Sequence, residues 1–458
     1  MKKKQIGIVT FDYPLGYQAL TINSALMLER EGYEVHIFID APSYEEFKIS
    51  FGDFGDKNII IHPIDKRDSA LEATSALSRF ESFITTIGAA LQTLPGHGAP
   101  LRSFYRQAAS LCWKFYLVFY ELYYNRGSSC EKLKKQASDF FPDLFDFQQR
   151  VAESLHGDYV CLLGIDQYGL IAATMASESG SYKRRMPIFY FSMELLLKGY
   201  LHTLRMQVLS SLERSCIKSC YCVVIQDEKR AEHFVADNRL PQEKLVYLPV
   251  SGLRAPYRAK SDYLRELFGI RHDKRILLYA GAIMDYGMCL ELVEAANNWG
   301  DDLVLILHSP VTPQSIHFDP AYVDEVKRAS RDNKVYLSLN PVPWEKLPEL
   351  ISSADIGLMF YKEKDPNFLE IGRSSNKLVQ YLQAGLPIIT VDFPSLRSVT
   401  KACRCGESAH SPDEIEALAR NIFANYDVYR NHAFECYQTR YRIADYFDDV
   451  LDRIRQIG

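Results

Sequence analysis

The sequence predicts an α/β protein with two doubly wound parallel sheets, each in a domain of its own. Three observations lead to this expectation. Short apolar runs rich in β-branched residues alternate with segments of helical periodicity at residues 5–61, 158–249 and 274–391. A stretch of linker composition at residues 250–256 separates the last series from the first two. The length of 458 residues exceeds what one core usually serves and suits two domains of about 200 residues each.

The first series predicts the start of one sheet. Strands are expected at residues 5–11, 34–39 and 59–61, with a helix at residues 18–30 between the first two. Such a βαβ unit opens a parallel sheet whose ligands bind beyond the carboxyl ends of the strands. Gly16, in the first strand-to-helix loop, either lets a substrate approach the backbone or serves only the turn.

A helical insertion is expected in this first domain at about residues 68–155, where helical periodicity replaces the alternation. Residues 104–124 carry nine aromatic side chains, interrupted by Arg106, Lys114 and Glu121. These charges argue against a membrane-spanning helix, which needs about 20 predominantly apolar residues. Three interpretations remain: a buried packing helix, a dimer face, or a surface for peripheral membrane contact and an apolar acceptor.

Polar residues follow three of the expected strands of the first domain. Asp166 comes after the strand at residues 158–163, Glu194 after residues 187–191, and Asp227 after residues 221–226. Because the carboxyl ends of parallel strands meet at one edge of a sheet, we expect these side chains to face one cleft. Each of them alone could instead be a helix cap.

The second domain is predicted from the last series of alternating segments. Gly281 ends a strand at residues 274–281, and His308 ends another at residues 303–307. The expected boundaries are residues 1–252 for the first domain, 253–262 for the linker, 263–436 for the second domain, and 437–458 for a final helix that crosses back to the first domain.

Composition excludes several classes of protein. A net charge of −5 gives no reason to expect a nucleic-acid partner. The ten cysteines lack the spacing of a zinc site, and Cys161 and Cys222 lie in apolar runs, as small core residues do. The basic start leads directly into a strand without the apolar region of a signal peptide. We therefore expect a reducing cytoplasm, with the inner membrane face as a peripheral location.

One stretch, residues 373–390, stands out as a candidate anion site. It predicts a helix with Leu378, Tyr381 and Leu382 on its inward face, ended by Gly385 and followed by a buried strand at residues 387–391. The first turn of a helix leaves backbone N–H groups unpaired and carries the positive end of the dipole. Polar and basic residues at this start suit a phosphate or diphosphate. A capped surface helix would have the same local sequence.

The same stretch resembles a known signature. The run Ser375-Asn376-Lys377-Leu378-x-Gln380-Tyr381-x-x-Ala384-Gly385-x-Pro387-Ile388 is similar to the donor site of retaining, nucleotide-sugar-dependent glycosyltransferases of family four. These enzymes have the GT-B fold, in which two Rossmann-like domains face a cleft. In that family the loop and helix start hold the donor diphosphate, and a Glu before the Tyr holds the ribose. Gln380 stands in that place here.

The chain departs from the family pattern at two further places. The other Glu of the family's E-x7-E pair falls at Gly372, with Glu370 close by. The family's G-R-x-x-x-x-K-G motif, whose cations neutralise the diphosphate, corresponds to residues 281–287, which contain neither Arg nor Lys. Charge-assisted contacts to phosphate are the strong ones. Arg373 and Lys377 would therefore carry the charge of the leaving group together with the helix dipole.

The resemblance implies transfer of a sugar from a nucleoside diphosphate sugar to a hydroxyl, with retention, in polysaccharide or glycoconjugate biosynthesis. The acceptor would be a glycan or a lipid-linked molecule, and neither a metal nor a further cofactor is expected. Asp166 and Glu194 are the candidates for orienting the sugar or the acceptor. The predicted donor-binding residues are Gly16, Gly281, Ala282, His308, Val342, Pro343, Arg373, Ser374, Ser375, Asn376, Lys377 and Gln380.

Two other functions remain open at this point. The missing acids and cations are compatible with a non-catalytic GT-B protein that binds a nucleotide sugar or partners an active transferase. A nucleotide-sugar epimerase would need acids and a His around the sugar, for which His308 and Glu370 are available.

Overall fold

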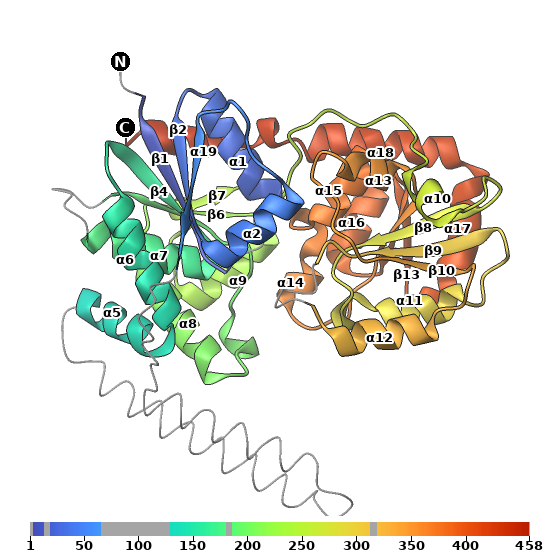
Figure 1. The fold of residues 1–458 in the computed structure, drawn as a ribbon, viewed down its shortest axis with the longest axis horizontal. Coiled ribbons are helices and arrows are strands. Elements are labelled where there is room, and N and C mark those ends of the chain that lie inside the picture. Colours follow the sequence, from blue (N-terminus) through green and yellow to red (C-terminus); the bar gives the residue numbers. More distant parts are fainter. Residues whose placement is uncertain (1–2, 13–18, 66–128, 180–185, 312–317, 458) are drawn as a thin grey trace, which may run out of the picture.

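A computed structural model describes residues 3–12, 19–65, 129–179, 186–311 and 318–457. These residues form two sheets in two lobes (Figure 1). The first sheet has the strand order β3-β2-β1-β4-β5-β6-β7 and the second the order β10-β9-β8-β11-β12-β13, with parallel pairing throughout. Two doubly wound α/β domains were expected, and the fold class is confirmed.

The strands are short and buried, as their apolar sequences predict. In the first sheet they are β1 (Gln5–Thr10), β2 (Glu34–Asp40), β3 (Ile59–Ile64), β4 (Tyr159–Ile165), β5 (Ile188–Phe191), β6 (Cys222–Ile225) and β7 (Leu245–Tyr247). In the second they are β8 (Arg275–Ala280), β9 (Leu303–His308), β10 (Val335–Ser338), β11 (Ile356–Met359), β12 (Ile388–Val391) and β13 (Gly406–Ala409). The order reverses between β1 and β4 and between β8 and β11, where parallel sheets bind ligands.

Helices cover both sheets. The first domain contains α1 (Ala19–Arg30), α2 (Ala41–Ser50), α5 (Ser129–Phe140), α6 (Pro142–Ser154), α7 (Asp166–Ser179), α8 (Leu204–Ile217) and α9 (Glu228–Asn238). The second contains α10 (Tyr263–Phe268), α11 (Cys289–Ala296), α12 (Pro320–Ala329), α13 (Leu347–Ser352), α14 (Pro366–Leu369), α15 (Asn376–Gln383), α16 (Pro394–Cys403) and α17 (Ile415–Ala424).

Of the predicted helical insertion, α5 and α6 fall in the described residues. The aromatic segment 104–124 lies outside them, so its three interpretations stay predictions. None of the helices in the described ranges is both long and apolar enough to cross a membrane.

Helix α15 is held on the second sheet by its own sequence. Leu378, Tyr381 and Leu382 are fully buried, as their spacing predicts, and Gly385 ends the helix in the left-handed conformation (φ 68°). The Tyr381 hydroxyl accepts the N–H of Ala280 at 2.8 Å and donates to the carbonyl of Leu278 at 2.9 Å. Its buried hydroxyl thereby satisfies its hydrogen bonds at β8 and fixes the position of the helix over the switch point.

The C-terminal segment differs from the single helix expected at residues 437–458. Helix α18 (Tyr426–Arg440) ends after Arg440, a short turn follows, and α19 (Phe447–Arg455) packs against α1 and β7 of the first domain. In the turn, Tyr441 and Ile443 are buried, and Arg442 pairs with Gly252. The chain bends at this buried turn as it crosses from the second lobe to α19 on the first (Figure 1).

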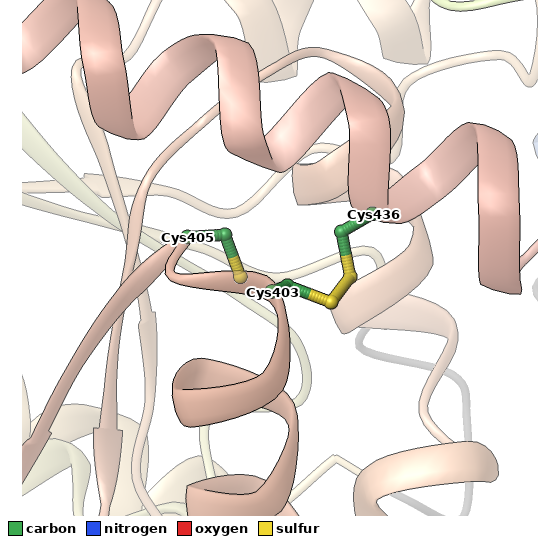
Figure 2. Close-up of side chains that lie close together, drawn as sticks. All are labelled: Cys403, Cys405 and Cys436. Atoms are coloured by element: carbon green, nitrogen blue, oxygen red, sulfur yellow. A yellow bond between two sulfur atoms is a disulfide. The ribbon is translucent and has the colours of Figure 1, made fainter.

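A disulfide between Cys403 and Cys436 links the end of α16 to α18 (Figure 2). Cys405 lies beside it, and the three sulfur atoms are within 4.8 Å of one another. Cys161 and Cys222 are buried in the core, as expected. The spacing of the cysteines did not predict this disulfide, and the reducing cytoplasm stays a prediction.

We expect this disulfide to contribute roughly 2–4 kcal/mol to the free energy of unfolding, because it closes a loop across a sequence separation of 33 residues. Denaturant titrations with and without a reductant should show this difference in the wild-type protein. The double variant Cys403→Ser/Cys436→Ser is the control, and its stability should not respond to the reductant. Equal stability of the wild-type protein under both conditions would contradict the expectation.

Candidate active site

A cavity of about 400 Å³ lies between the two domains, at the carboxyl edges of both sheets. Both domains contribute to its wall. The first domain provides Glu46, Ser50, Glu194 and Arg230. The second provides, among others, Gly281, Ala282, His308, Val342, Trp344, Asn367, Ser374, Ser375, Asn376, Lys377 and Gln380. Nine of the twelve predicted donor-binding residues therefore line one cavity.

Lys377, in the first turn of α15, is the most unusual residue of this wall. Its side chain passes between two aromatic rings, with Nζ 3.5 Å from the ring centre of Tyr279 and 4.9 Å from that of Tyr361. Nζ is buried and has no hydrogen-bond partner among the described residues. Desolvation lowers the pKa of the amine to about 7. Near neutral pH this amine can therefore exchange a proton and take up an anion.

The glycine that ends β8 makes room for this lysine. A β-carbon at Gly281 would lie 3.1 Å from Cε and Nζ of Lys377. Gly281 was predicted as a donor-binding residue at the end of a strand. In the structure it allows close approach of the Lys377 amine, so that a larger residue would push this side chain out of its place.

The remaining residues at the start of α15 have defined partners. Ser375 caps the helix, because its Oγ accepts the N–H of Leu378 at 3.2 Å. Asn376 reaches across the cleft, where its Oδ1 accepts the N–H of Ala19 at 3.2 Å. Ala19 is the first residue of α1, so the positive ends of two helices meet at the cavity. The capped-helix interpretation is thus correct for Ser375, and the helix start nevertheless faces the cleft.

His308, at the end of β9, is a buried neutral side chain on the cavity wall. Its Nδ1 lies 2.9 Å from the Ser338 hydroxyl, and its Nε2 has no partner in the described residues. Desolvation lowers the pKa of the imidazole to about 4. An uncharged ring nitrogen with no partner suits a hydrogen bond to a neutral group of a ligand.

Arg373 is placed differently from the prediction. Its guanidinium donates to the carbonyl of Arg440 and to the hydroxyl of Tyr446, both at 2.9 Å, and lies over the rings of Tyr441 and Tyr446. It does not line the cavity. Sequence proximity to Lys377 suggested a second phosphate cation, but the turn before α15 directs Arg373 to the C-terminal crossing, where it holds the final segment in place.

Two other predicted residues also lie off the cavity wall. Pro343 is exposed, and its carbonyl accepts N–H bonds from Lys346 and Leu347 at the start of α13. Asp166 accepts the backbone N–H of Glu194 at 3.2 Å, so it supports the strand end rather than facing the cavity. Gly16 lies outside the described residues.

Glu194 lines the cavity from the end of β5, as the polar strand ends predicted. Its side chain is exposed at the cleft, and desolvation by the surrounding protein raises the pKa of the carboxyl. Its backbone is held from both sides, because Asp166 accepts its N–H and the Gln167 amide donates to its carbonyl at 2.6 Å. A carboxyl with a raised pKa and a fixed backbone can accept or donate a proton at the cleft.

Sequence reasoning missed several residues of the wall, among them Glu46, Ser50, Arg230 and Asn367, and the last two bond to each other across the domains. Arg230 lies in the first turn of α9 and is 1% exposed, and Asn367 lies in α14 of the opposite domain. The guanidinium donates to Asn367 Oδ1 at 3.1 Å. Asp227 was predicted to follow a strand at the cleft. The first turn of the helix after such a strand also borders the cleft. That rule would have found Arg230, three residues later.

The far end of the cavity is a domain contact built around Trp344. The backbone N–H of Trp344 donates to the carbonyl of Ser50 in α2 at 2.8 Å. The indole ring of Trp344 packs against Phe51 at a centroid distance of 6.1 Å. The Arg254 guanidinium lies over the same ring. Trp344 therefore anchors the domains to each other and also borders the cavity.

No protein-family model and no curated protein matches the chain in sequence. Solved structures match it over its whole length. HepE of Anabaena in complex with UDP-glucose has a TM-score of 0.63 at 11% identity, covering 99% of this chain and 100% of that one. Sucrose-phosphate synthase of Thermosynechococcus elongatus has a TM-score of 0.62 at 13% identity, covering 99% of both chains. The chain has the GT-B fold.

Another GT-B neighbour, a glycosyltransferase of Rickettsia africae, has a TM-score of 0.60 at 10% identity and covers 100% of this chain and 99% of its own. Identities of this size establish the fold, and they leave the reaction to the residues of the site.

We expect Lys377→Met to stabilise the protein. The pKa of Lys377 is about 7 in the folded state against 10.5 for an ordinary lysine, so the unfolded state binds more protons between these values. The loss of stability caused by burying the Lys377 amine is complete below pH 7 and decreases as the pH rises toward 10.5. The variant should gain on the order of 2–4 kcal/mol at pH 6.5 and about half of that at pH 9.

Denaturant unfolding of both proteins across this pH range measures the gain. The exposed Lys346, which pairs with Glu349 on α13, provides the control Lys346→Met, whose stability should stay within about 0.5 kcal/mol of the wild type. A Lys377→Met variant that is less stable than the wild type at pH 6.5 would show that the amine has a partner in solution.

Proposed function

We propose that this protein is a glycosyltransferase that moves a sugar from a nucleoside diphosphate sugar to a hydroxyl acceptor with retention of the anomeric configuration. One observation carries the proposal: a buried amine without a partner faces the interdomain cavity at the N-terminus of α15. Such a site attracts an anion by its dipole, its N–H groups and its proton-accepting lysine. The neighbour HepE, solved with UDP-glucose, supports the choice of a nucleotide sugar.

The chemistry follows from the placement of charge. Sugar transfer breaks the bond between the anomeric carbon and the diphosphate, so negative charge grows on the leaving oxygen. Donors that are already oriented toward that oxygen stabilise this charge without reorganisation. The start of α15 and Lys377 provide such donors, and a lysine with a pKa of about 7 can become charged as the diphosphate arrives. A front-face reaction with retention needs no carboxylate nucleophile, which fits Gly372 and Gln380 in place of two acids.

The positions of the other cavity residues suggest a role for each of them. Gln380 follows Lys377 by nearly one helical turn on α15 and would bond a ribose hydroxyl through its amide. Val342 and Trp344 would border the base at the far end. Glu194 enters from the opposite domain, where the sugar and the acceptor hydroxyl would meet, and is our candidate for orienting that hydroxyl. The acceptor class, glycan or lipid-linked, stays a prediction, as do the cytoplasmic location and the absence of a metal.

The same residues bear on the two alternative functions, a non-catalytic binding protein and an epimerase. A non-catalytic nucleotide-sugar-binding protein is favoured by the missing acids and by the diversion of Arg373. An epimerase would need Glu370 beside the sugar, and in the described cavity wall Glu370 is not present. The first alternative binds donors without turnover, so a combined binding and turnover experiment separates it from the transferase.

The experiment screens nucleoside diphosphates and their sugars for thermal stabilisation and then for turnover. A ligand at 100 times its dissociation constant should add about 2.7 kcal/mol to the free energy of unfolding. We expect a nucleoside diphosphate sugar to stabilise the wild-type protein and the Lys346→Met control but not Lys377→Met. NMR of the sugar product should show the anomeric configuration of the donor.

Each part of the proposal can fail separately in this screen. Stabilisation of Lys377→Met equal to that of the wild type would reject the donor-site assignment. An inverted product would reject retention, and tight binding without hydrolysis or transfer to any hydroxyl acceptor would favour the non-catalytic alternative.

A further inference from the structure

Two cationic side chains line the cavity wall from opposite domains, and neither forms an ion pair with a described residue. Lys377 comes from α15 of the second domain and Arg230 from α9 of the first. They are 8% and 1% exposed. In the described part of the chain, neither forms an ion pair within 4.0 Å with a carboxylate. Burying a cation without a counter-ion is costly, so this arrangement is unusual for a purely structural pair.

The hydrogen bonds of Arg230 show which N–H donors of its guanidinium have no acceptor among the described residues. Nε donates to Gln226 Oε1 at 2.7 Å, and NH2 donates to the carbonyl of Met193 at 2.6 Å and to Asn367 Oδ1 at 3.1 Å. NH1 has a single long contact, 3.4 Å to the Ser374 hydroxyl. A guanidinium has five N–H donors, two of them on NH1. NH1 therefore holds the spare donor capacity, on the side that faces the turn before α15.

The hydrogen-bond acceptors of Arg230 are neutral groups, and no carboxylate of the described residues lies within 4.0 Å of its guanidinium. Glu194, Asp227, Asp166 and Asp365 act on it from beyond ion-pair distance. Ser374 and Lys377, which bracket the start of α15, line the same cavity. An anion at this helix start would thus lie between a guanidinium and an amine. A diphosphate, with two negative charges on adjacent phosphates, matches two separate cations better than a carboxylate does.

We propose that Arg230 is a second diphosphate-binding residue of the donor site, supplied by the opposite domain. This inference rests on the proposed function and extends the donor site to the first domain. Arg230 takes the place of the cations that the loop at residues 281–287 lacks and that Arg373 does not supply. The diphosphate site is then assembled across the domain interface and is complete only when the two domains are together.

Asn367 has a different part in this assembly. Its Oδ1 accepts the N–H of Leu195 at 2.7 Å, and its amide donates to the Leu195 carbonyl at 3.0 Å. It therefore joins the domains through the backbone of Leu195 and also orients the Arg230 guanidinium. Asn367 is a positioning residue, and its removal would loosen Arg230 without removing the charge.

The competing explanation is that Arg230 only holds the domains together through Asn367 and Ser374. The two explanations differ in the ranking of variants. If Arg230 only joins the domains, Asn367→Ala should weaken ligand binding as much as Arg230→Gln does. If Arg230 binds the diphosphate, the loss of its charge should cost far more than the loss of Asn367.

The experiment is calorimetric titration of the full-length protein with UDP and with inorganic pyrophosphate. We expect Arg230→Gln to weaken both ligands roughly 10- to 100-fold, as the loss of a charge-assisted contact implies. Arg230→Lys, which keeps the charge but not the planar fork, should fall between this variant and the wild type. The fold loss of affinity in Asn367→Ala should be at least ten times smaller than the fold loss in Arg230→Gln. Lys229→Ala, which removes an exposed charge paired with Glu232 on the same helix, should bind like the wild type.

The outcomes separate this inference from the proposed function. Wild-type affinity in a folded Arg230→Gln variant, with binding lost in Lys377→Met, would overturn the role of Arg230 and leave the donor site standing. Equal losses in Arg230→Gln and Asn367→Ala would also overturn it, in favour of a structural role. A wild-type protein that binds neither UDP nor pyrophosphate would overturn both.

Discussion

The structure depends on one electrostatic imbalance, the burial of the Lys377 amine at the start of α15 without a counter-ion. Two tyrosine rings enclose the amine, and desolvation lowers its pKa to about 7. Its surroundings keep it in that place: Gly281 leaves room beside it, and the Tyr381 hydroxyl fixes the helix on β8. A buried amine without a counter-ion at a cleft favours the binding of an anion. The attraction between the two charges offsets the free-energy cost of desolvating the amine.

The second theme is that the site belongs to both domains. The first residues of α1 and α15 meet through Ala19 and Asn376, the domains join again at Ser50 and Trp344, and α14 contacts the strand end of β5 through Asn367. These contacts surround the cavity. Charge from one domain and a helix start from the other can therefore act on one ligand. If the cleft binds a nucleotide sugar as proposed, this arrangement would couple donor binding to the approach of the domains, since an open cleft would separate the two sources of charge.

Sequence patterns predicted the two sheets and the helix at residues 376–383, and they placed most of the predicted donor residues on the cavity wall, because hydrophobic period and strand-end rules depend on local sequence. They failed where distant segments decide the outcome. Arg373 has the right neighbours in sequence, but its side chain binds Tyr446 and the carbonyl of Arg440. Asp166 ends a strand at the right edge, yet its carboxylate holds the backbone of Glu194. Arg230 follows a polar strand end by one helical turn, and only the packing of the other domain against α9 reveals its surroundings.

The most direct test of the central claim is an NMR titration of the Lys377 amine, in protein with isotope-labelled lysine, using Lys377→Met to assign the signal. In the free protein the amine should titrate near pH 7. Saturation with UDP-glucose, whose diphosphate does not change charge between pH 6 and 9, should raise this pKa by about 2 units, because the anion supplies the missing counter-charge. An amine that titrates near 10 in the free protein, or a pKa that bound UDP-glucose leaves unchanged, would contradict the account.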